Sequence, residues 1–142
     1  MTSSWIPQPL RELVRQRASD RCEYCQTPTW LTGQPHEIDH ILPRSEGGPT
    51  TSENLCLACG TCNGNKRTNT IGADPQTKQT VALFHPREQH WSEHFAWSED
   101  GTNIIGLTPC GRATTEALQM NHRLIVAARE IWVSVGHHPP HD

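Results

Sequence analysis

Apolar residues recur at helical spacing close to the start of the chain. Between residues 8 and 18, Leu10, Leu13, Val14 and Ala18 fall on one face of a helix, with arginines opposite them. Asp20 then interrupts the pattern. The pattern predicts a short amphipathic N-terminal helix that leads into the first pair of cysteines.

A second helical pattern lies near the end of the chain. From about Thr115, residues recur every three or four positions, at Leu118, Asn121, Leu124 or Ile125, Ala128, Ile131 or Trp132, and Val135. Gly136 follows as a stop signal. We expect one long C-terminal helix that packs on the core, although Trp132 would also suit a dimer surface.

Between these helices the apolar pattern changes to that of strands. The segment HEIDHIL alternates and ends at Pro43, and Gly47-Gly48-Pro49 marks a loop. A second short strand is expected at Leu55–Leu57, and a helical turn from about Gly60 to Arg67. The predicted order is therefore strand, loop, strand, helix.

Residues 72–90 are polar and contain prolines, so we expect a connection there. After it, Phe95 and Trp97 alternate before an Asp100-Gly101 turn, and Ile104 resumes the pattern, which predicts a β-hairpin. The fold class is α+β. With 142 residues, the chain is expected to form a single domain, 1–142, with a core at about 21–68 and a C-terminal extension at about 73–142.

Composition narrows the class of protein further. At 34% hydrophobic and 19% charged, the chain is typical of soluble globular proteins, and no stretch approaches the roughly 20 apolar residues that span a bilayer. The N-terminus MTSSWIPQPL lacks the pattern of a signal peptide, so a cytoplasmic protein is expected, with no membrane partner. The net charge of −3 disfavours wholesale wrapping of nucleic acid but allows a local contact.

Six cysteines, four of them in two CxxC pairs, point to a metal site. Cys22 and Cys25 form one pair, and Cys59 and Cys62 form the other, with 33 residues between the two pairs. Because the cytosol keeps thiols reduced, a tetrahedral zinc site is favoured over disulfides. The alternative is that these cysteines are isolated buried thiols that bind no metal, but paired spacing rarely arises by chance in so short a chain.

The choice of zinc ligands has one ambiguity, because Cys56 with Cys59 is also a CxxC pair. We choose Cys59 and Cys62. Cys56 lies in the apolar run Leu55–Ala58, where a free cysteine packs as a small hydrophobe. Cys110 has no CxxC partner, and both remaining cysteines are expected to be structural or inert.

Residues suited to metal-assisted hydrolysis lie between and just after the two cysteine pairs. Asp39 and Asn63 offer hard oxygen ligands that suit Mg²⁺, which keeps several waters and needs few protein groups. His40 can then stay free of metal. Adjacent side chains of a strand diverge, so a base at His40 and a ligand at Asp39 can approach a phosphate from different directions.

The order YC, DHI-P, GG, NL and C-x-x-CN-x-x-K, over roughly residues 21–68, resembles the HNH endonuclease family, which has a ββα-metal (His-Me finger) core. The resemblance implies that His40 is the general base and that Asn54 fixes the ring or the hairpin that holds it. Asp39 and Asn63 would hold the catalytic divalent ion. The last letter of the family name is often histidine, and the oxygen ligand Asn63 in its place favours Mg²⁺ or Mn²⁺.

Further charged residues surround this pattern. Arg44, Lys66 and Arg67 are candidates to hold DNA phosphates, each weighed against ordinary solvated charge. Glu37 is equally well explained as a carboxylate supporting a metal ligand or as a solvated strand residue. Asn63 directly follows Cys62, so a structural zinc would fix the backbone that carries a catalytic ligand.

The expected reaction is hydrolysis of DNA by a His40-activated water, giving 5′-phosphate and 3′-hydroxyl ends. The main alternative is a catalytically idle zinc module that binds nucleic acid, and a zinc-stabilised protein-interaction domain comes third. His90-Trp-Ser-Glu93-His94 also matches the HxxEH protease motif, but it leads into strand-like alternation rather than a long helix. Sequence specificity would come from a homodimer or from a partner protein.

Overall fold

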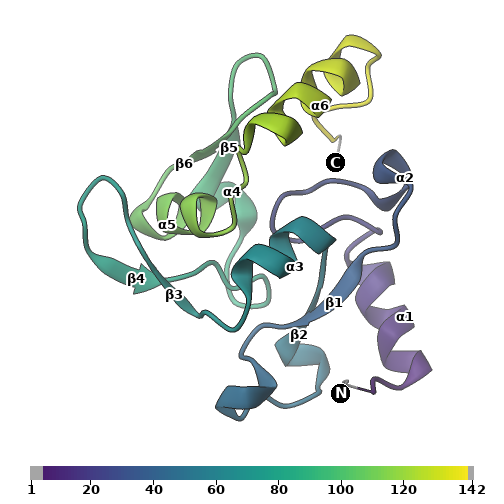
Figure 1. The fold of residues 1–142 in the computed structure, drawn as a ribbon. Helices are drawn as coiled ribbons and strands as arrows, with labels where there is room; N and C mark the ends of the chain where they lie inside the picture. The colour runs from purple at the N-terminus through teal and green to yellow at the C-terminus, as the bar shows by residue number, and fades with distance from the viewer. Residues whose placement is uncertain (1–4, 141–142) are drawn as a thin grey trace.

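The computed structural model describes residues 5–140, which form short helices and three two-stranded antiparallel sheets (Figure 1). Helices and small sheets are both present, in agreement with the expected α+β class. The elements follow in the order α1 (Gln8–Arg17), α2 (Thr29–Thr32), β1 (Glu37–His40), β2 (Leu55–Ala58), α3 (Gly60–Lys66), β3 (Ile71–Ala73), β4 (Thr80–Ala82), α4 (Trp91–His94), β5 (Phe95–Trp97), β6 (Ile104–Gly106), α5 (Pro109–Ala117) and α6 (Arg123–Ser134). Two 3-10 turns, Arg44–Glu46 and Ser52–Asn54, lie in the loop between β1 and β2.

The predicted order of strand, loop, strand and helix is found in β1, β2 and α3. The two strands pair so that Asp39 lies opposite Cys56 and His40 opposite Leu55. Helix α3 packs against β1, and α1 packs against β2 on the other side of the pair (Figure 1). All four residues of β2 are buried, so this strand forms the centre of the unit.

Helix α1 confirms the N-terminal prediction, with one exception on its inner face. Val14 is fully buried, and Leu10 and Ala18 are partly buried against the same cluster. Leu13, expected on that face, is 44% exposed. The guanidinium of Arg17, in the last turn, donates to backbone carbonyls of Ser52 and Leu55 and fastens the helix to the start of β2.

The segment 72–90 is not a plain connection, because it begins with a hairpin formed by β3 and β4. Asp74 starts the turn: its carboxylate accepts from the Gln76 amide at 3.0 Å and from the Thr77 hydroxyl at 2.8 Å. Arg112 of α5 donates two hydrogen bonds of 2.9 Å to the same carboxylate. The hairpin is therefore held by a residue almost forty positions away, which local pattern could not reveal.

The predicted long C-terminal helix is wrong: the segment forms two helices, α5 and α6, separated by residues 118–122. Gln119 has a φ of 54°, which ends the first helix. Asn121 then donates to the carbonyl of Ile104 at 2.8 Å and accepts from its amide at 2.7 Å, completing the backbone hydrogen bonds of β6. The chain leaves the helix so that this side chain can reach the strand edge.

The apolar face expected on the last helix is also largely exposed. Leu124, Ile131 and Val135 are 68%, 65% and 59% exposed. The residue of α6 that is buried is Arg129, at 0% exposed, and its guanidinium donates to the carbonyls of Thr102 and Met120. Helix α6 is thus anchored by a buried cation rather than by its apolar stripe.

The largest hydrophobic cluster joins the cysteine-bearing segment to the C-terminal elements. It includes Cys22, Tyr24 and Cys62 together with Phe84, Phe95, Leu118 and other buried residues as far as Met120. The hairpin of β5 and β6 confirms its prediction, and Phe95 is 1% exposed. Over residues 5–140, no helix is long and apolar enough to cross a membrane.

Candidate active site

The two CxxC pairs meet. The Sγ atoms of Cys22, Cys25, Cys59 and Cys62 all lie within 4.8 Å of one another, and those of Cys25 and Cys59 are 3.7 Å apart. Four thiolates bound to one zinc ion at about 2.3 Å would place their sulfurs roughly 3.8 Å apart. The backbone amides of Cys25 and Cys62 also donate to the first sulfur of their own pair. The donor set and its spacing therefore fit zinc.

The remaining cysteines lie outside this cluster. Cys56 is fully buried in β2, and its thiol points to the Asp39 carboxylate, 3.7 Å away. Burial, reinforced by the charge of Asp39, raises the pKa of the Cys56 thiol well above its ordinary value, so Cys56 stays protonated. Cys110 is partly buried in α5.

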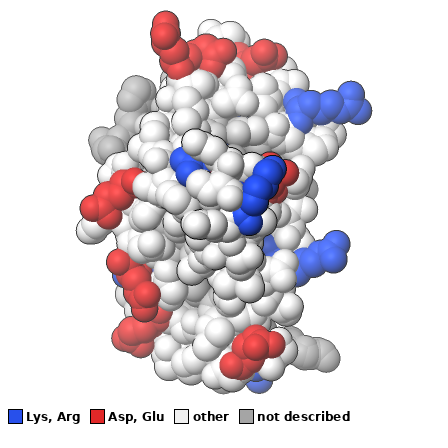
Figure 2. Space-filling model, turned by 90° about the vertical axis from the view of Figure 1, so that its left-hand side faces the viewer, with Lys and Arg blue, Asp and Glu red and all other residues white. Residues whose placement is uncertain are grey.

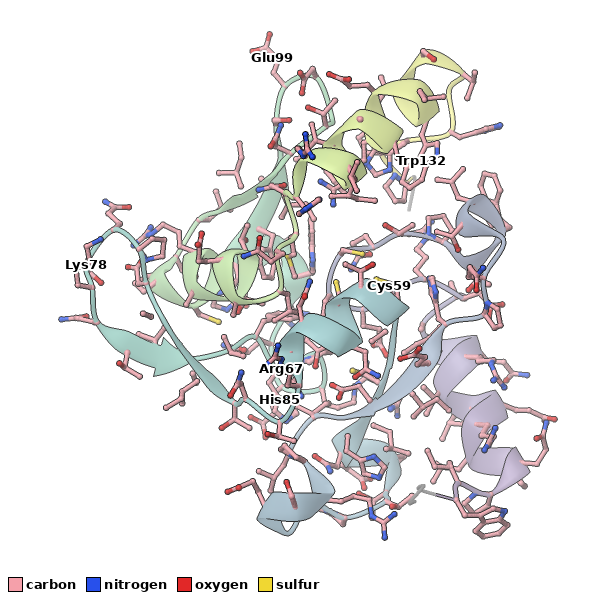
Figure 3. All side chains as sticks on the ribbon, in the orientation of Figure 1. Cys59, Arg67, Lys78, His85, Glu99 and Trp132 are labelled. Carbon is pink, nitrogen blue, oxygen red and sulfur yellow. The ribbon has the colours of Figure 1, made fainter. Side chains whose placement is uncertain are left out.

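Most of the other predicted site residues surround one surface hollow of about 300 Å³. β1 supplies Asp39 and His40, the loop after it supplies Arg44, and α3 with its C-terminal cap supplies Asn63 and Arg67. Cys59 and Arg67 mark the two ends of α3 in Figure 3. The remaining lining residues are Ile38, Pro43, Ser45 and Thr68.

Asp39 lines this hollow and is only 5% exposed. Its Oδ2 accepts a hydrogen bond of 2.8 Å from the Tyr24 hydroxyl and lies 3.1 Å from the ammonium of Lys66. Oδ1 has a longer contact of 3.4 Å with the same ammonium. One carboxylate oxygen is therefore committed to the protein, and the other is the more available one for a ligand.

The prediction that Lys66 contacts DNA phosphate is wrong. Its side chain is 2% exposed, and its ammonium donates to the carbonyl of Ile41 at 3.1 Å besides pairing with Asp39. A buried cation is stable only when such partners replace its lost hydration. Lys66 thus holds the end of β1 against α3, whereas its neighbour Arg67 is exposed on the wall of the hollow.

Asn63 is the middle residue of α3 and directly follows Cys62. Its Nδ2 donates a hydrogen bond of 2.7 Å to Oε1 of Glu37, the first residue of β1. The amide nitrogen is thereby turned toward Glu37, which leaves the amide oxygen free of this contact. The residues present fit a hard divalent ion, because Asn63 Oδ1 and Asp39 Oδ1 are both oxygen donors at one hollow.

His40 is half-buried beside these donors. Burial and the charge of Arg44 lower the pKa of the His40 ring below its ordinary value, and Asp39 opposes them. The ring is therefore neutral at physiological pH, and a neutral ring can accept a proton. Its Nε2 lies 2.9 Å from the hydroxyl of Thr50.

Asn54 is 7% exposed and binds the loop that follows β1. Its Oδ1 accepts from the Leu42 amide at 2.9 Å, and its Nδ2 donates to the carbonyls of Leu42 at 3.0 Å and Pro49 at 2.9 Å. Of the two roles that the resemblance left open, these contacts match the one in which Asn54 holds the loop. Within residues 5–140 its side-chain hydrogen bonds go to backbone, and none goes to the His40 ring.

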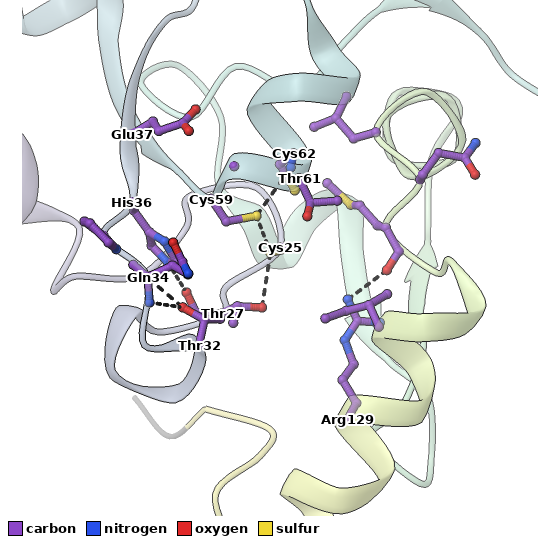
Figure 4. Close-up of a pocket in the computed structure, with 16 residues that line it drawn as sticks. Cys25, Thr27, Thr32, Gln34, His36, Glu37, Cys59, Thr61, Cys62 and Arg129 are labelled. Carbon is purple, nitrogen blue, oxygen red and sulfur yellow. Dashed lines mark hydrogen bonds between the residues drawn. The ribbon is translucent and has the colours of Figure 1, made fainter.

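A second cavity, of about 320 Å³, lies between the cysteine cluster and α6 (Figure 4). Cys25, Cys59 and Cys62 line it, with Arg129 on the opposite side. It contains none of Asp39, His40 and Asn63. The hollow beside His40 is thus the one that brings the predicted base together with the two predicted metal ligands, Asp39 and Asn63.

The HxxEH segment forms the single-turn helix α4 (Trp91–His94). The Nδ1 of His94 lies 2.7 Å from the Thr108 hydroxyl, and His90 is exposed. Among the described residues, the four cysteines are the one group of His, Cys, Asp and Glu side chains close enough to share a metal ion. The segment therefore forms no metal site.

The sequence assigned no role to two residues of the site, although Tyr24 is part of the YC element of the pattern. Tyr24, between the cysteines of the first pair, bonds to Asp39, and Thr50, in a polar loop, bonds to His40. The available signal for Tyr24 was that the sole tyrosine of the chain stands inside a CxxC pair. Nothing in the sequence around Thr50 distinguishes it from its neighbour Thr51.

A ββα unit that carries a four-cysteine cluster, and whose strand and helix bring together a histidine and two oxygen donors, has the features of a small metal-dependent nuclease core. The HNH endonuclease family model matches residues 22–69. The chain thus carries an HNH endonuclease domain in this segment, which coincides with the residues that build the cluster and the hollow.

A protein of Corynebacterium diphtheriae (strain ATCC 700971 / NCTC 13129 / Biotype gravis) is similar to part of this chain. It is the CRISPR-associated endonuclease Cas9, 42% identical over 52 residues. The match covers 36% of this chain and 5% of that protein. The similarity therefore concerns one short segment of a much longer relative.

Proposed function

We propose that this chain is a metal-dependent endonuclease that hydrolyses phosphodiester bonds in DNA. The observation that carries the proposal is the meeting of His40, Asp39 and Asn63 around one hollow, inside the segment that matches the HNH family. A neutral histidine beside two oxygen donors is the set that metal-assisted hydrolysis needs. Binding of nucleic acid alone requires no such set.

Asp39 and Asn63 would hold a Mg²⁺ or Mn²⁺ ion through their Oδ1 atoms. Bound there, the ion would stabilise the negative charge that develops on the phosphate and on the leaving oxygen. Two protein oxygens leave most of the coordination shell to waters and phosphate oxygens. Glu37 keeps the Asn63 side chain in the required orientation by accepting from its Nδ2.

His40 would act as the general base. It takes a proton from a water molecule, whose oxygen forms the new bond to phosphorus while the bond to the 3′ oxygen breaks. That oxygen leaves with the bonding electrons and takes a proton from solvent, so the products carry 5′-phosphate and 3′-hydroxyl ends. Asn54 supports the base by holding the loop from Leu42 to Pro49.

Arg44 and Arg67 would hold phosphates on either side of the cleaved bond. Both are exposed and line the hollow, one from the loop after β1 and the other from the end of α3. On the face drawn in Figure 2, basic side chains are scattered among acidic ones and form no continuous patch. Because the net charge is −3, we propose that the DNA contact is local, and we assign sequence specificity to a homodimer or a partner protein.

The four cysteines would bind a structural zinc ion. Cys59 and Cys62 flank the start of α3, and Asn63 follows in the same turn, so zinc would fix the position of a catalytic ligand. Tyr24, between Cys22 and Cys25, would transmit the same constraint to Asp39. The protein would therefore bind two metal ions, a structural zinc at the cysteines and a catalytic Mg²⁺ or Mn²⁺ at Asp39 and Asn63.

The test is incubation of supercoiled plasmid with zinc-loaded protein in the presence and absence of Mg²⁺ or Mn²⁺. We expect nicking that depends on the added ion, and nicks that DNA ligase reseals because they carry 5′-phosphate and 3′-hydroxyl ends. A gel shift that needs no added ion, without cleavage under any of these conditions, would instead support the idle nucleic-acid-binding module.

A further inference from the structure

The ring of His40 has two nitrogens, and the structure gives them different surroundings. Nε2 lies 2.9 Å from Oγ1 of Thr50. For Nδ1, residues 5–140 provide no hydrogen-bond partner, and this atom is not among the buried polar atoms left unpaired. A neutral imidazole carries its proton on one nitrogen and offers a lone pair on the other. The partner of Nε2 therefore bears on which nitrogen can act as a base.

Thr50 is held in place by the hydrogen bonds of Asn54. Asn54 binds the carbonyl of Pro49, the residue before Thr50, and both backbone groups of Leu42, the second residue after His40. At Gly48 a Cβ atom would lie 1.8 Å from the Leu42 carbonyl oxygen, so the two ends of the loop are in close contact. The Asn54 side chain does not contact the His40 ring itself. The Thr50 hydroxyl makes that contact.

The direction of this hydrogen bond has a chemical consequence. If the Thr50 hydroxyl donated to Nε2, the ring proton would sit on Nδ1, and no lone pair would remain for a water molecule. If the hydroxyl accepts from Nε2–H, the lone pair of Nδ1 is free. After the ring has taken a second proton, both nitrogens are donors, so an accepting hydroxyl keeps its bond before and after proton transfer.

The charged groups around the ring do not supply this contact. Arg44 from the following loop, Asp39 from the same strand and Lys66 from α3 act on His40 through their charge. In many catalytic sites a carboxylate orients the histidine. Here the neighbouring carboxylate, Asp39, is bound to Tyr24 and Lys66, which leaves the orienting contact to Thr50.

We propose that Thr50 is a positioning residue whose Oγ1 accepts a hydrogen bond from Nε2–H of His40 and keeps Nδ1 free to take the proton of the attacking water. This inference rests on the proposed nuclease function for its role, although the hydrogen bond can be tested without DNA. Asn54 then acts on the base in two steps, through the loop and through Thr50. The proposal adds a residue that the DHI-P, GG and NL pattern does not include.

The test compares wild type with Thr50→Val, which keeps the shape but removes the hydroxyl, and Thr50→Ser, which keeps the hydroxyl. The first readout is the ¹⁵N NMR spectrum of the His40 ring in the full zinc-loaded chain, at a pH where the ring is neutral. We expect the Nε2–H tautomer in wild type and in Thr50→Ser, and a mixture of tautomers in Thr50→Val. An Nδ1–H tautomer in wild type would overturn the proposal, whether or not the variants fold.

The second readout is plasmid cleavage by the same three proteins, checked for equal zinc content. For Thr50→Val we expect kcat to fall by about 10–100-fold with little change in KM, and for Thr50→Ser we expect both constants near those of wild type. If wild type cleaves DNA and Thr50→Val matches it in both tautomer and kcat, Thr50 is not a positioning residue, and the nuclease function stands. If no protein cleaves DNA but the tautomer shifts as expected, the hydrogen bond is upheld and the nuclease function fails.

Discussion

Lys66 and Asp39 form a buried ion pair that links the stability of the fold to the geometry of the site. Their side chains are 2% and 6% exposed, and their closest atoms are 3.1 Å apart. Removing charges from water is costly, and the pair repays that cost only while both members and their hydrogen bonds are present. Each residue is therefore expected to depend strongly on the other.

Replacement of Lys66 by methionine should destabilise the protein by about 3–5 kcal/mol, because it leaves the Asp39 carboxylate buried without its cation. The measurement is denaturant unfolding at neutral pH. Arg67→Ala is the matched control, since Arg67 is the exposed next residue and should change stability by no more than roughly 0.5 kcal/mol. Equal stability of the two variants would show that the pair does not stabilise the fold.

Glu37 is expected to act through Asn63. Glu37→Ala removes the acceptor of the Asn63 amide, so the amide can turn away from the hollow. We predict that about 10–100-fold more Mg²⁺ or Mn²⁺ is needed for half-maximal cleavage, with unchanged zinc content. Glu46→Ala, which removes an exposed carboxylate from the neighbouring loop, should leave the metal requirement as it is. A shift of the same size in both variants would mean that only the overall charge matters.

At the scale of residues, the sequence predicted the groups that belong to a short motif. The four cysteines meet as expected, and His40, Asp39 and Asn63 share one hollow. The exceptions are residues whose role depends on the packing of distant segments. Lys66 was assigned to DNA because it is a basic residue shortly after Asn63, and its burial follows only from how α3 packs on β1.

At the scale of elements, the sequence predicted those with a strong local period and missed those that other elements hold in place. Helix α1 and strands β1 and β2 lie where the pattern put them. The hairpin of β3 and β4 depends on Arg112, and the break between α5 and α6 lets Asn121 pair with Ile104. Both contacts join residues far apart in sequence, so a helical or polar pattern could not indicate them.

The end of α6 is docked on β5 by His138, whose ring is 4.4 Å from that of Trp97 and 5.8 Å from that of Trp132. Both ring nitrogens are buried and have no partner among the described residues. Burial, together with the nearby charge of Arg129, lowers the pKa of His138 to about 4. The folded protein therefore keeps this ring neutral at a pH where the unfolded chain would protonate it.

This shift predicts a loss of stability in mild acid. The unfolded chain takes up a proton at His138 near the ordinary pKa of 6.5, whereas the folded chain does so only near 4, so stability falls as the pH drops through this window. Thermal unfolding at several pH values from about 7.5 to 5.5 measures the effect. Wild type should lose more stability over this range than His138→Phe, whereas His90→Gln, at an exposed histidine, should follow wild type. Parallel curves for wild type and His138→Phe would contradict the prediction.

At the scale of the whole molecule, the cysteine cluster lies where residues 22–69, which match the HNH family model, pack against the C-terminal helices and strands. The main hydrophobic cluster contains Cys22, Cys25 and Cys62 as well as Leu118 and Met120. The spacing of the four cysteines was enough to predict that they meet. The motif does not indicate that the C-terminal helices and strands pack against them. Metal binding to such a site contributes directly to folding.

Removal of zinc is therefore expected to unfold more of the protein than the segments around the two CxxC pairs. A strong chelator, or Cys59→Ser, should abolish cooperative thermal unfolding and much of the helical circular dichroism, and zinc should restore the chelated wild type. Cys110→Ser, at a cysteine outside the cluster, should keep one zinc per chain and unfold as wild type does. A cooperative transition that persists without zinc would show that the hydrophobic cluster is sufficient for the fold.

The most direct test of the proposed nuclease function is the cleavage of supercoiled plasmid by wild type and by His40→Ala at equal zinc content, with Mg²⁺ or Mn²⁺ added. We expect metal-dependent nicking by wild type and a rate lower by about 10²–10⁴-fold in His40→Ala, with the same thermal unfolding midpoint, because a general base is lost and the fold is kept. Cleavage by His40→Ala at the wild-type rate would contradict the assignment of the base and, with it, the proposed chemistry of the hollow.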